Sequence, residues 1–358
     1  MQRTEIDVHG FVKLSIDSDF PWAEAWLEPL RDLKVVSPIH SSSTVELRVQ
    51  YSDIDPTGLR YVGHNLLIGK HAVLDSKYRV QLGRDDDDVL SVYTDRPAVE
   101  WLIWLLQLGL LTAGATFIHA AAVEHNGHAL LFPSWGGVGK TALVQKFVQQ
   151  SGYRLLGDDL AIIDGSSQCY GFPKPMVLYA YHNAVFPDVF SSGRGPTAPA
   201  FLNNLLSRLA IRLKPVLRMV PGVLQFARTH NPQSVQILPS EVFGPEKLAA
   251  NAAARAVVWL ERLKGLTEVE ICPGKHTLPA RIMGSTLNEI DQRCIRTTNV
   301  AMGVGIVKLD DFYDSWSRVL SQALSDVPQY VVYLPESMPI QDMPDAVWQA
   351  LEAVGVRI

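Results

Sequence analysis

The chain has 358 residues, of which 47% are apolar and 19% are charged, and it contains 8 Trp. At roughly 150 residues per domain, this length predicts two domains or one large domain with insertions, and the composition excludes a disordered or low-complexity chain. The formal net charge of −5 lacks the global attraction to phosphate backbones on which general nucleic-acid binders depend, so DNA and RNA are not expected partners.

The N-terminal part predicts a small, mostly antiparallel β-rich unit over residues 1–95, because short alternating segments such as 45–49 and 78–82 are separated by turn residues. Residues 1–10 mix charges without an apolar stretch, so no signal peptide is expected. Four acids at 85–88 suggest either an acidic metal loop or a solvated turn, and the absence of calcium-loop spacing favours the turn.

The uncharged run 101–123 is long enough to cross a bilayer, which takes about 20 residues. It contains Gln107 and His119, however, and changes from a helix-like to a strand-like pattern halfway along. We therefore expect a buried helix followed by a buried strand at 117–123, with a membrane span as the alternative.

From residue 96 onward, helical and apolar strand patterns alternate, which predicts an α/β domain over 96–358. The expected strands and helices are 129–132, 140–150, 153–156, 160–163, 257–261, 268–271, 309–324, 330–334 and 343–354. A basic insertion is expected at about 190–235, where the segment 208–228 suggests a helical lid, a clasp for an acidic partner, or a plain amphipathic surface helix. The three cysteines have no paired spacing, which excludes a disulfide framework or zinc knuckle and fits a reducing cytoplasm.

Residues 134–141, SWGGVGKT, fit the phosphate-loop pattern GxxxxGK[ST] except that Ser134 takes the place of the first glycine. The loop lies between an expected strand and an expected helix, where backbone N–H groups form an anion site. Lys140 would neutralise phosphate charge and the Thr141 hydroxyl would bind Mg²⁺. The alternative is a glycine-rich turn that caps a helix by chance. The expected nucleotide-binding residues are Ser134, Gly136, Gly137, Val138, Gly139, Lys140, Thr141 and Ala142.

Asp158 and Asp159 end the next apolar strand. In a parallel sheet the carboxyl ends of the strands meet at one edge, so these acids are expected beside the loop. One acid can hold Mg²⁺ while its neighbour accepts the proton of an attacking hydroxyl. A solvated strand end or a helix cap is the alternative interpretation.

Two further candidates depend on their surroundings. His119 lies on the strand before the loop, where a hydrogen-bonded core histidine is the ordinary interpretation. Arg262 follows the segment VVWLE and could neutralise charge on a transferred phosphoryl group, with a surface arginine as the alternative.

The ordered set of His119-Ala-Ala-Ala-Val, Ala129-Leu-Leu-Phe, the loop 134–141 and Leu-Leu-Gly-Asp158-Asp159 resembles the catalytic core of the HPr kinase/phosphorylase group. It is most similar to the HPr-kinase-related branch, and phosphoenolpyruvate carboxykinases share the plan more distantly. Weaker similarities occur at 171–175 and 257–262. The match covers about 118–164.

The resemblance implies an α/β fold, with a P-loop kinase core of the HPr kinase C-terminal type, a mixed central sheet and a smaller β-rich N-terminal unit. It also implies that Lys140 and Thr141 bind nucleotide phosphate and Mg²⁺, that Asp158 is the general base, that Asp159 is a metal ligand and that His119 faces the phosphoryl group or a metal. Ser134 and Trp135 depart from the family's loop. The downstream Glu- and Arg-containing signature of bacterial HPr kinases has no copy here, which argues that HPr is not the acceptor.

The sequence thus predicts a cytoplasmic, ATP- and Mg²⁺-dependent kinase that transfers the γ-phosphoryl group to a hydroxyl of a Ser/Thr peptide, a protein or a small metabolite. The catalytic set would be Asp158, Lys140, His119 and Arg262. A nucleotide-gated binding protein or ATPase without an acceptor is the alternative, and a carboxykinase-like enzyme is a third possibility. A homo-oligomer is left open.

Overall fold

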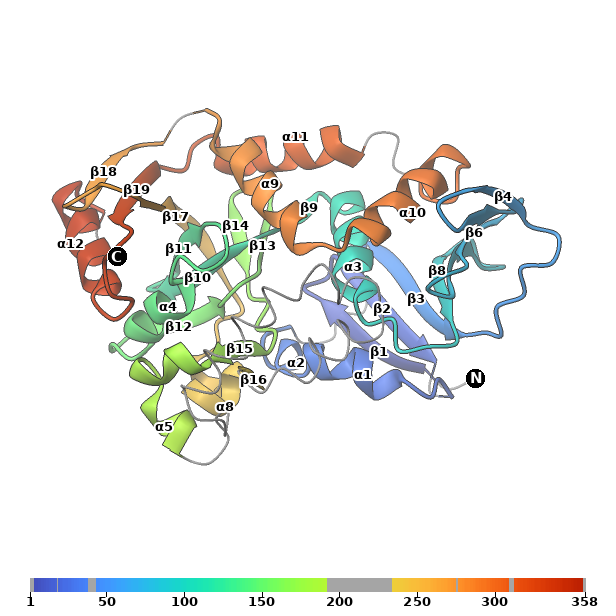
Figure 1. Ribbon diagram of the computed structural model, residues 1–358, viewed down its shortest axis with the longest axis horizontal. Coiled ribbons are helices and arrows are strands. Elements are labelled where there is room, and N and C mark those ends of the chain that lie inside the picture. The colour runs from blue at the N-terminus through green and yellow to red at the C-terminus, as the bar shows by residue number, and fades with distance from the viewer. Residues whose placement is uncertain are drawn as a thin grey trace.

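The computed structural model describes residues 3–17, 19–37, 43–191, 234–274, 276–308 and 312–356. The expected helix at 208–228, and most of the basic insertion at 190–235, lie outside these residues. Within them the chain is α/β, built on two large sheets and one short strand pair (Figure 1). The N-terminal sheet lies on one side of the molecule and the second sheet on the other, with helix α3 (Trp101–Thr112) between them.

The N-terminal sheet has the described strand order β1-β2-β3-β8-β7-β6-β5-β4. It is not antiparallel throughout, because β2 pairs with β3 and β3 pairs with β8 in parallel. Short helical segments α1, η1 and α2 connect β2 to β3. The bounds are β1 (Arg3–Val8), β2 (Val12–Asp17), α1 (Ala23–Leu27), η1 (Glu28–Leu30), α2 (Leu33–Val36), β3 (Val45–Tyr51), β4 (Arg60–Gly63), β5 (Leu66–Ile68), β6 (Ala72–Asp75), β7 (Val80–Arg84) and β8 (Leu90–Thr94).

The acidic run at 85–88 is tied into ion pairs. Arg48, whose side chain is 9% exposed, pairs with Asp85 and lies 2.7 Å from Asp87. Asp88 pairs with Lys308 and lies 3.5 Å from Arg84. Among the described residues, none of these acids belongs to a cluster with metal-ligand spacing. The run is a turn in which Asp85, Asp87 and Asp88 pair with protein cations.

The second sheet has the described order β12-β10-β11-β17-β14-β13-β9, and β19 and β18 extend it along the second half of β17. It is mixed: β11, β17 and β19 pair in parallel, whereas β10 is antiparallel to both β11 and β12. A separate pair, β15 and β16, is antiparallel. The bounds are β9 (Ala115–Ile118), β10 (Ala120–His125), β11 (His128–Pro133), β12 (Tyr153–Gly157), β13 (Ala161–Asp164), β14 (Gln168–Tyr170), β15 (Met176–Tyr179), β16 (Ser234–Ile237), β17 (Asn251–Leu263), β18 (Glu270–Pro273) and β19 (Gln329–Pro335).

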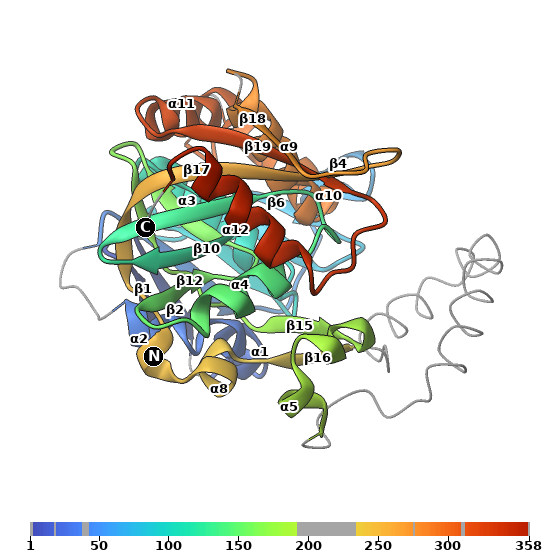
Figure 2. The same cartoon turned by 90° about the vertical axis from the view of Figure 1, so that its left-hand side faces the viewer.

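Helices α4 and α12 pack together beside β10, β12 and β19 (Figure 2). Helices α9 and α11 pack on β9. The remaining bounds are α4 (Lys140–Val148), η2 (Ala180–Ala184), α5 (Pro187–Val189), α8 (Pro239–Phe243), η4 (Pro245–Lys247), α9 (Leu278–Glu289), α10 (Gln292–Gly303), α11 (Phe312–Leu324) and α12 (Met343–Ala353). The strands expected at 129–132, 153–156, 160–163, 268–271 and 330–334 occur with small shifts of their ends, as do the helices α4, α11 and α12. The strand expected at 257–261 is much longer, because β17 already begins at Asn251. Helices α9 and α10 were not predicted.

The run 101–123 forms a buried helix and then strand structure, as expected. The single strand expected at 117–123 is wrong in one respect, because it breaks at His119 into β9 and β10. At the break, the backbone N–H of His119 donates to Thr286 Oγ1 over 3.0 Å instead of to a strand. None of the described helices has the length and apolar character needed to cross a membrane.

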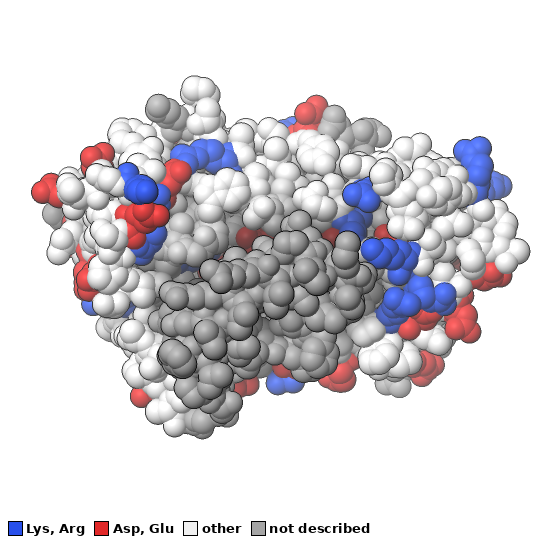
Figure 3. Space-filling view, viewed as in Figure 1, with Lys and Arg blue, Asp and Glu red and all other residues white. Residues whose placement is uncertain are grey.

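Most buried apolar side chains form one core that includes both large sheets and α3. A second, smaller apolar cluster surrounds Ala142 of α4 and includes Met176, Leu178, Val185, Phe186 and Ile237. On the face shown in Figure 3, basic side chains lie interspersed with acidic ones. Ion pairs such as Arg79–Asp95 and Arg293–Asp291 illustrate this pairing.

Candidate active site

Three segments meet at one edge of the second sheet. Strands β11 and β12 point the same way because both are antiparallel to β10, which lies between them. The loop 134–139 follows β11, Asp158 and Asp159 follow β12, and His119 precedes β10. The sheet therefore brings the loop, the two acids and the histidine together, although the strand between β11 and β12 is antiparallel.

The loop has the backbone geometry of an anion cradle. Gly137 and Gly139 have φ values of +81° and +121°, which disfavour other residues. Helix α4 begins directly after Gly139, and no side chain caps its N-terminus. Its first backbone N–H groups are thus available to an external acceptor, at the positive end of the helix dipole.

Lys140 is directed into the sheet edge with 7% exposure. Its Nζ lies 2.9 Å from His119 Nε2 and donates to the carbonyl oxygen of Ser134 over 3.3 Å. Burial lowers the pKa of Lys140, against the opposing effect of the charges on Asp159 and Asp158. Ser134 itself is fully buried, and its hydroxyl donates to the carbonyl oxygen of Trp135 over 3.1 Å.

Asp158 is buried, with 6% exposure. Thr141 Oγ1 donates to Asp158 Oδ2 over 3.3 Å, whereas Asp158 Oδ1 is buried without a partner among the described residues. Burial, aided by the charge of Asp159, raises the pKa of Asp158 to about 7. This carboxyl group thus has one free oxygen and an increased affinity for a proton.

Asp159 has the opposite electrostatic character. Its Oδ2 lies 2.6 Å from Lys174 Nζ, and its Oδ1 lies 2.9 Å from His119 Nε2. Burial alone would raise the pKa of Asp159, but the charge of Lys174 and the hydrogen bond with His119 outweigh it and hold the pKa well below its ordinary value. Burial would lower the pKa of Lys174, but the charge and hydrogen bond of Asp159, together with the charges of Asp158 and Glu289, outweigh it and raise that pKa. Two adjacent carboxyl groups are thereby separated into a proton acceptor and a permanent anion.

His119 Nε2 has conflicting neighbours. It lies 2.9 Å from the ammonium of Lys140 and 2.9 Å from the carboxylate of Asp159. A ring nitrogen either accepts with its lone pair or donates its N–H, so it cannot satisfy both groups at once. His119 Nδ1 is buried without a partner in the described structure.

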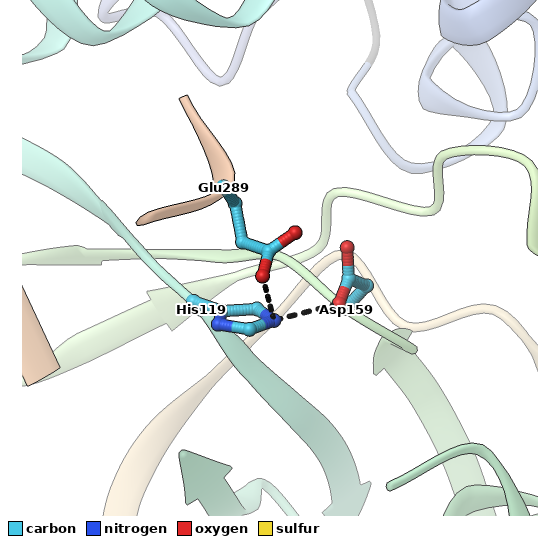
Figure 4. A group of neighbouring side chains, drawn as sticks. All are labelled: His119, Asp159 and Glu289. Atoms are coloured by element: carbon cyan, nitrogen blue, oxygen red, sulfur yellow. Dashed lines mark hydrogen bonds and ion pairs between the residues drawn. The ribbon is translucent and has the colours of Figure 1, made fainter. Parts of the chain in front are cut away.

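The same nitrogen belongs to a set of groups that could hold a divalent ion. His119 Nε2, Asp159 Oδ1 and a carboxylate oxygen of Glu289 lie within 4.8 Å of one another (Figure 4). Glu289, the last residue of α9, lies 3.9 Å from His119 Nε2. One nitrogen and two carboxylate ligands fit a divalent cation, and the imidazole favours Mn²⁺ over Mg²⁺. Thr141, expected as a metal ligand together with Asp159, contacts Asp158 instead.

These groups line one cleft of about 290 Å³. Its walls come from the loop, the start of α4, the end of β12, the segment from Lys174 to η2, the end of α9 and the loop before α12. The lining residues are His119, Gly136, Gly137, Gly139, Lys140, Thr141, Asp158, Asp159, Lys174, Pro175, Val177, Tyr179, His182, Glu289 and Ile340.

Four predicted residues do not line this cleft. Arg262 donates through Nε to the carbonyl oxygen of Val138 over 3.0 Å and through Nη1 to that of Met338 over 2.7 Å. It therefore holds the loop in position from outside the cleft. Val138 is buried at 7% exposure, and Ala142 belongs to the second apolar cluster. Ser134 also stays outside the lining, and it contributes only its carbonyl to Lys140.

Seven residues that line the cleft were not predicted from the sequence. Lys174, His182 and Glu289 are the three of them with charged or basic side chains that the site uses or buries. Lys174 lies in the segment 171–175, whose weak family similarity was the one signal that could have found it. His182 and Glu289 lie in η2 and α9, and no sequence pattern identified either of them as a site residue.

No known protein family and no curated protein matches this chain in sequence searches.

Proposed function

We propose that this chain is a kinase related to the HPr kinase/phosphorylase group, which transfers the γ-phosphoryl group of ATP to a hydroxyl acceptor with the help of a divalent ion. The observation that carries the proposal is Asp158. Its carboxyl group is buried beside Thr141, one oxygen has no partner in the described structure, and it opens into the same cleft as the glycine-rich loop.

The proposed roles follow from the contacts. Backbone N–H groups of the loop and of the first turn of α4 would bind the β- and γ-phosphates, and Lys140 would neutralise charge on the transferred group. The acceptor hydroxyl oxygen forms a bond to the γ-phosphorus, the bond from that phosphorus to the bridging oxygen breaks, and ADP leaves. Asp158 Oδ1 accepts the hydroxyl proton.

His119, Asp159 and Glu289 would hold the divalent ion, whose charge offsets that of the phosphates. Lys174 keeps Asp159 ionised through its contact of 2.6 Å. Arg262 acts as a positioning residue in this scheme, because it holds the carbonyl of Val138 within the loop.

The test is transfer of labelled γ-phosphoryl from ATP by the whole chain, with Mg²⁺ or Mn²⁺, to Ser/Thr peptides, to small polyols and to a native cell extract. Lys140→Ala is expected to abolish labelling, since the neutralising charge is lost. Lys308→Ala, an exposed lysine with 61% of its side chain accessible, is the matched control and should transfer normally.

Two outcomes would contradict the proposal. Label recovered only as inorganic phosphate, whatever acceptor is offered, would favour an ATPase or a nucleotide-gated binding protein. Equal labelling by wild type and Lys140→Ala would show that the loop takes no part in phosphoryl transfer.

A further inference from the structure

A second cavity lies along helix α4, whose first two residues, Lys140 and Thr141, line the proposed active site. It has a volume of about 510 Å³, within the ordinary range for small-molecule sites. Its walls come from α4, from the segment between η2 and α5, from α8 and from the loop before α12. The lining residues are Ala142, Gln145, Lys146, Val148, Gln149, Ala184, Val185, Phe186, Pro187, Asp188, Val189, Val242, Phe243, Lys247, Gln341 and Pro344.

The cavity and the active-site cleft are lined by neighbouring residues on three pieces of chain. Thr141 lines the cleft and Ala142 the cavity, and the same is true of Ile340 and Gln341. On η2, His182 lines the cleft and Ala184 lines the cavity. Since a helix rises 1.5 Å per residue, Gln145 lies only about 6 Å along α4 from Thr141. A molecule whose phosphates bind at the start of α4 can therefore reach the cavity with its other end.

One wall of the cavity suits a flat apolar ring. Phe186 and Phe243 both line it, with ring centroids 6.3 Å apart. Both belong to the second apolar cluster, which Val189 and Val242 join as partly buried members. Aromatic and branched side chains around a hollow of this size provide a surface for a planar heterocycle.

The other wall offers neutral hydrogen-bonding groups. The side-chain amides of Gln145, Gln149 and Gln341 line the cavity and make no hydrogen bond with any described residue. An amide presents both donors and an acceptor, which complements the edge of a nucleobase.

The two lysines that line the cavity already have partners within the described residues, which favours a neutral ligand over an anion. Lys146 Nζ is 3.0 Å from Asp345, and Lys247 Nζ donates to the carbonyl oxygens of Val148 and Gln150 over 2.9 and 3.3 Å. Asp188, whose carboxylate makes no hydrogen bond or ion pair with any described residue, is the remaining charged group of the lining. A carboxylate can accept hydrogen bonds from ribose hydroxyls but repels phosphate.

We propose that this cavity binds the nucleoside of the nucleotide whose phosphates bind at the loop 134–139, with the base between the Phe186–Phe243 wall and the glutamine amides. The inference rests on the proposed function, because it takes the phosphate end of the ligand from it. It adds the site that distinguishes a nucleotide from a bare polyphosphate.

The test compares ATP with inorganic tripolyphosphate, both with Mg²⁺, by titration calorimetry on the whole chain. Gln145→Trp places a bulky ring in the cavity, and Gln349→Trp makes the same change on the exposed face of α12 as a matched control. Wild type is expected to bind ATP at least tenfold more tightly than tripolyphosphate. Gln145→Trp should weaken ATP binding at least tenfold and change tripolyphosphate binding less than twofold, while Gln349→Trp changes neither.

Gln149→Trp fills the cavity from one turn further along and repeats the test if Gln145→Trp does not fold. Equal weakening of both ligands would overturn the inference, since the change would then act through the loop. Wild-type affinities that are equal for both ligands and unaffected by Gln145→Trp would overturn it while leaving the phosphate site intact. Failure of wild type to bind either ligand would overturn the inference and the proposed function together.

Discussion

Replacing Asp158 by asparagine should lower phosphoryl transfer and, in the absence of metal, raise the stability of the fold. The carboxyl group is buried at 6% exposure next to a second carboxylate, so its charged form is costly. Asparagine has nearly the same shape, keeps an oxygen that can accept from Thr141 and has no charge. Without a base for the acceptor proton, transfer should fall about 10²- to 10⁴-fold while nucleotide affinity changes little.

The size of the stability effect follows from the pKa of Asp158, which rises from 3.8 to about 7 on folding. The folded chain binds this proton more tightly than the unfolded chain, so stability falls as the pH rises from 3.8 past 7. The full loss is about 4 kcal/mol. Asp158→Asn does not lose this stability, so its free energy of unfolding should exceed that of wild type by about 2 kcal/mol at pH 5 and by about 4 kcal/mol at pH 8.5.

The assay is urea unfolding followed by Trp fluorescence at both pH values with a metal chelator present. Asp326→Asn, at an exposed carboxylate whose one described side-chain contact is with Ser325, is the control and should show no such gain. An Asp158→Asn chain that is less stable than wild type at pH 8.5, or that is stabilised equally at both pH values, would refute the conclusion that burial raises the pKa of Asp158. Retained transfer in Asp158→Asn would refute its role as base.

Two further predictions concern other residues of the cleft. Glu289→Gln removes one carboxylate from the His119–Asp159–Glu289 set, so Mn²⁺ affinity measured by calorimetry should fall at least tenfold, and an unchanged affinity would place the ion elsewhere. Burial lowers the pKa of His182 to about 4, so protonation favours the unfolded chain and wild type should lose about 3 kcal/mol as the pH falls from 6.5 to 4. His182→Asn keeps an acceptor for the N–H of Tyr179, and in urea unfolding its stability should not fall by this amount over the same pH range. Identical pH profiles of stability for the variant and wild type would contradict this prediction.

Sequence reasoning predicted those parts of the site that depend on local order along the chain. The loop, the helix after it and the two acids at the end of the next strand follow one another within a short stretch, so turn chemistry and apolar runs were enough to place them. His119 was harder, because its strand breaks where its backbone N–H leaves the sheet to reach Thr286. That partner comes from α9, far away in sequence.

Helices α9 and α10 escaped prediction because their buried faces carry hydroxyls. In α9, Ser285 and Thr286 point inward and donate to the carbonyl oxygen of Ile282, each over 2.9 Å. In α10, Thr298 is buried and accepts from Trp104 Nε1 over 2.6 Å. These residues interrupt the apolar period and have weak helix propensity, so tertiary packing determines the structure. Glu289, at the end of α9, was missed for the same reason.

Arg262 illustrates how a residue type alone is ambiguous. An arginine after a buried strand beside a phosphate loop fits a charge-neutralising role, but four backbone carbonyls occupy its guanidinium, those of Val138, Pro335, Glu336 and Met338. Nothing in the sequence shows that the turn 335–338 and the loop present their carbonyls to one point. The parallel pairing of β17 with β11 on one side and with β19 on the other brings them there.

Under the proposed function, the charge balance of the cleft favours a divalent ion that binds together with the nucleotide. Lys140 and Lys174 contribute two positive charges, and Asp158, Asp159 and Glu289 contribute three negative charges when Asp158 is ionised. A polyphosphate entering alone would meet a net negative site, apart from the N-terminus of α4. A cation held by Asp159 and Glu289 reverses that balance and also ends the conflict at His119, whose Nε2 lone pair could then face the metal. The ammonium of Lys140 would be released toward the phosphates, so metal and nucleotide should each increase the affinity of the site for the other.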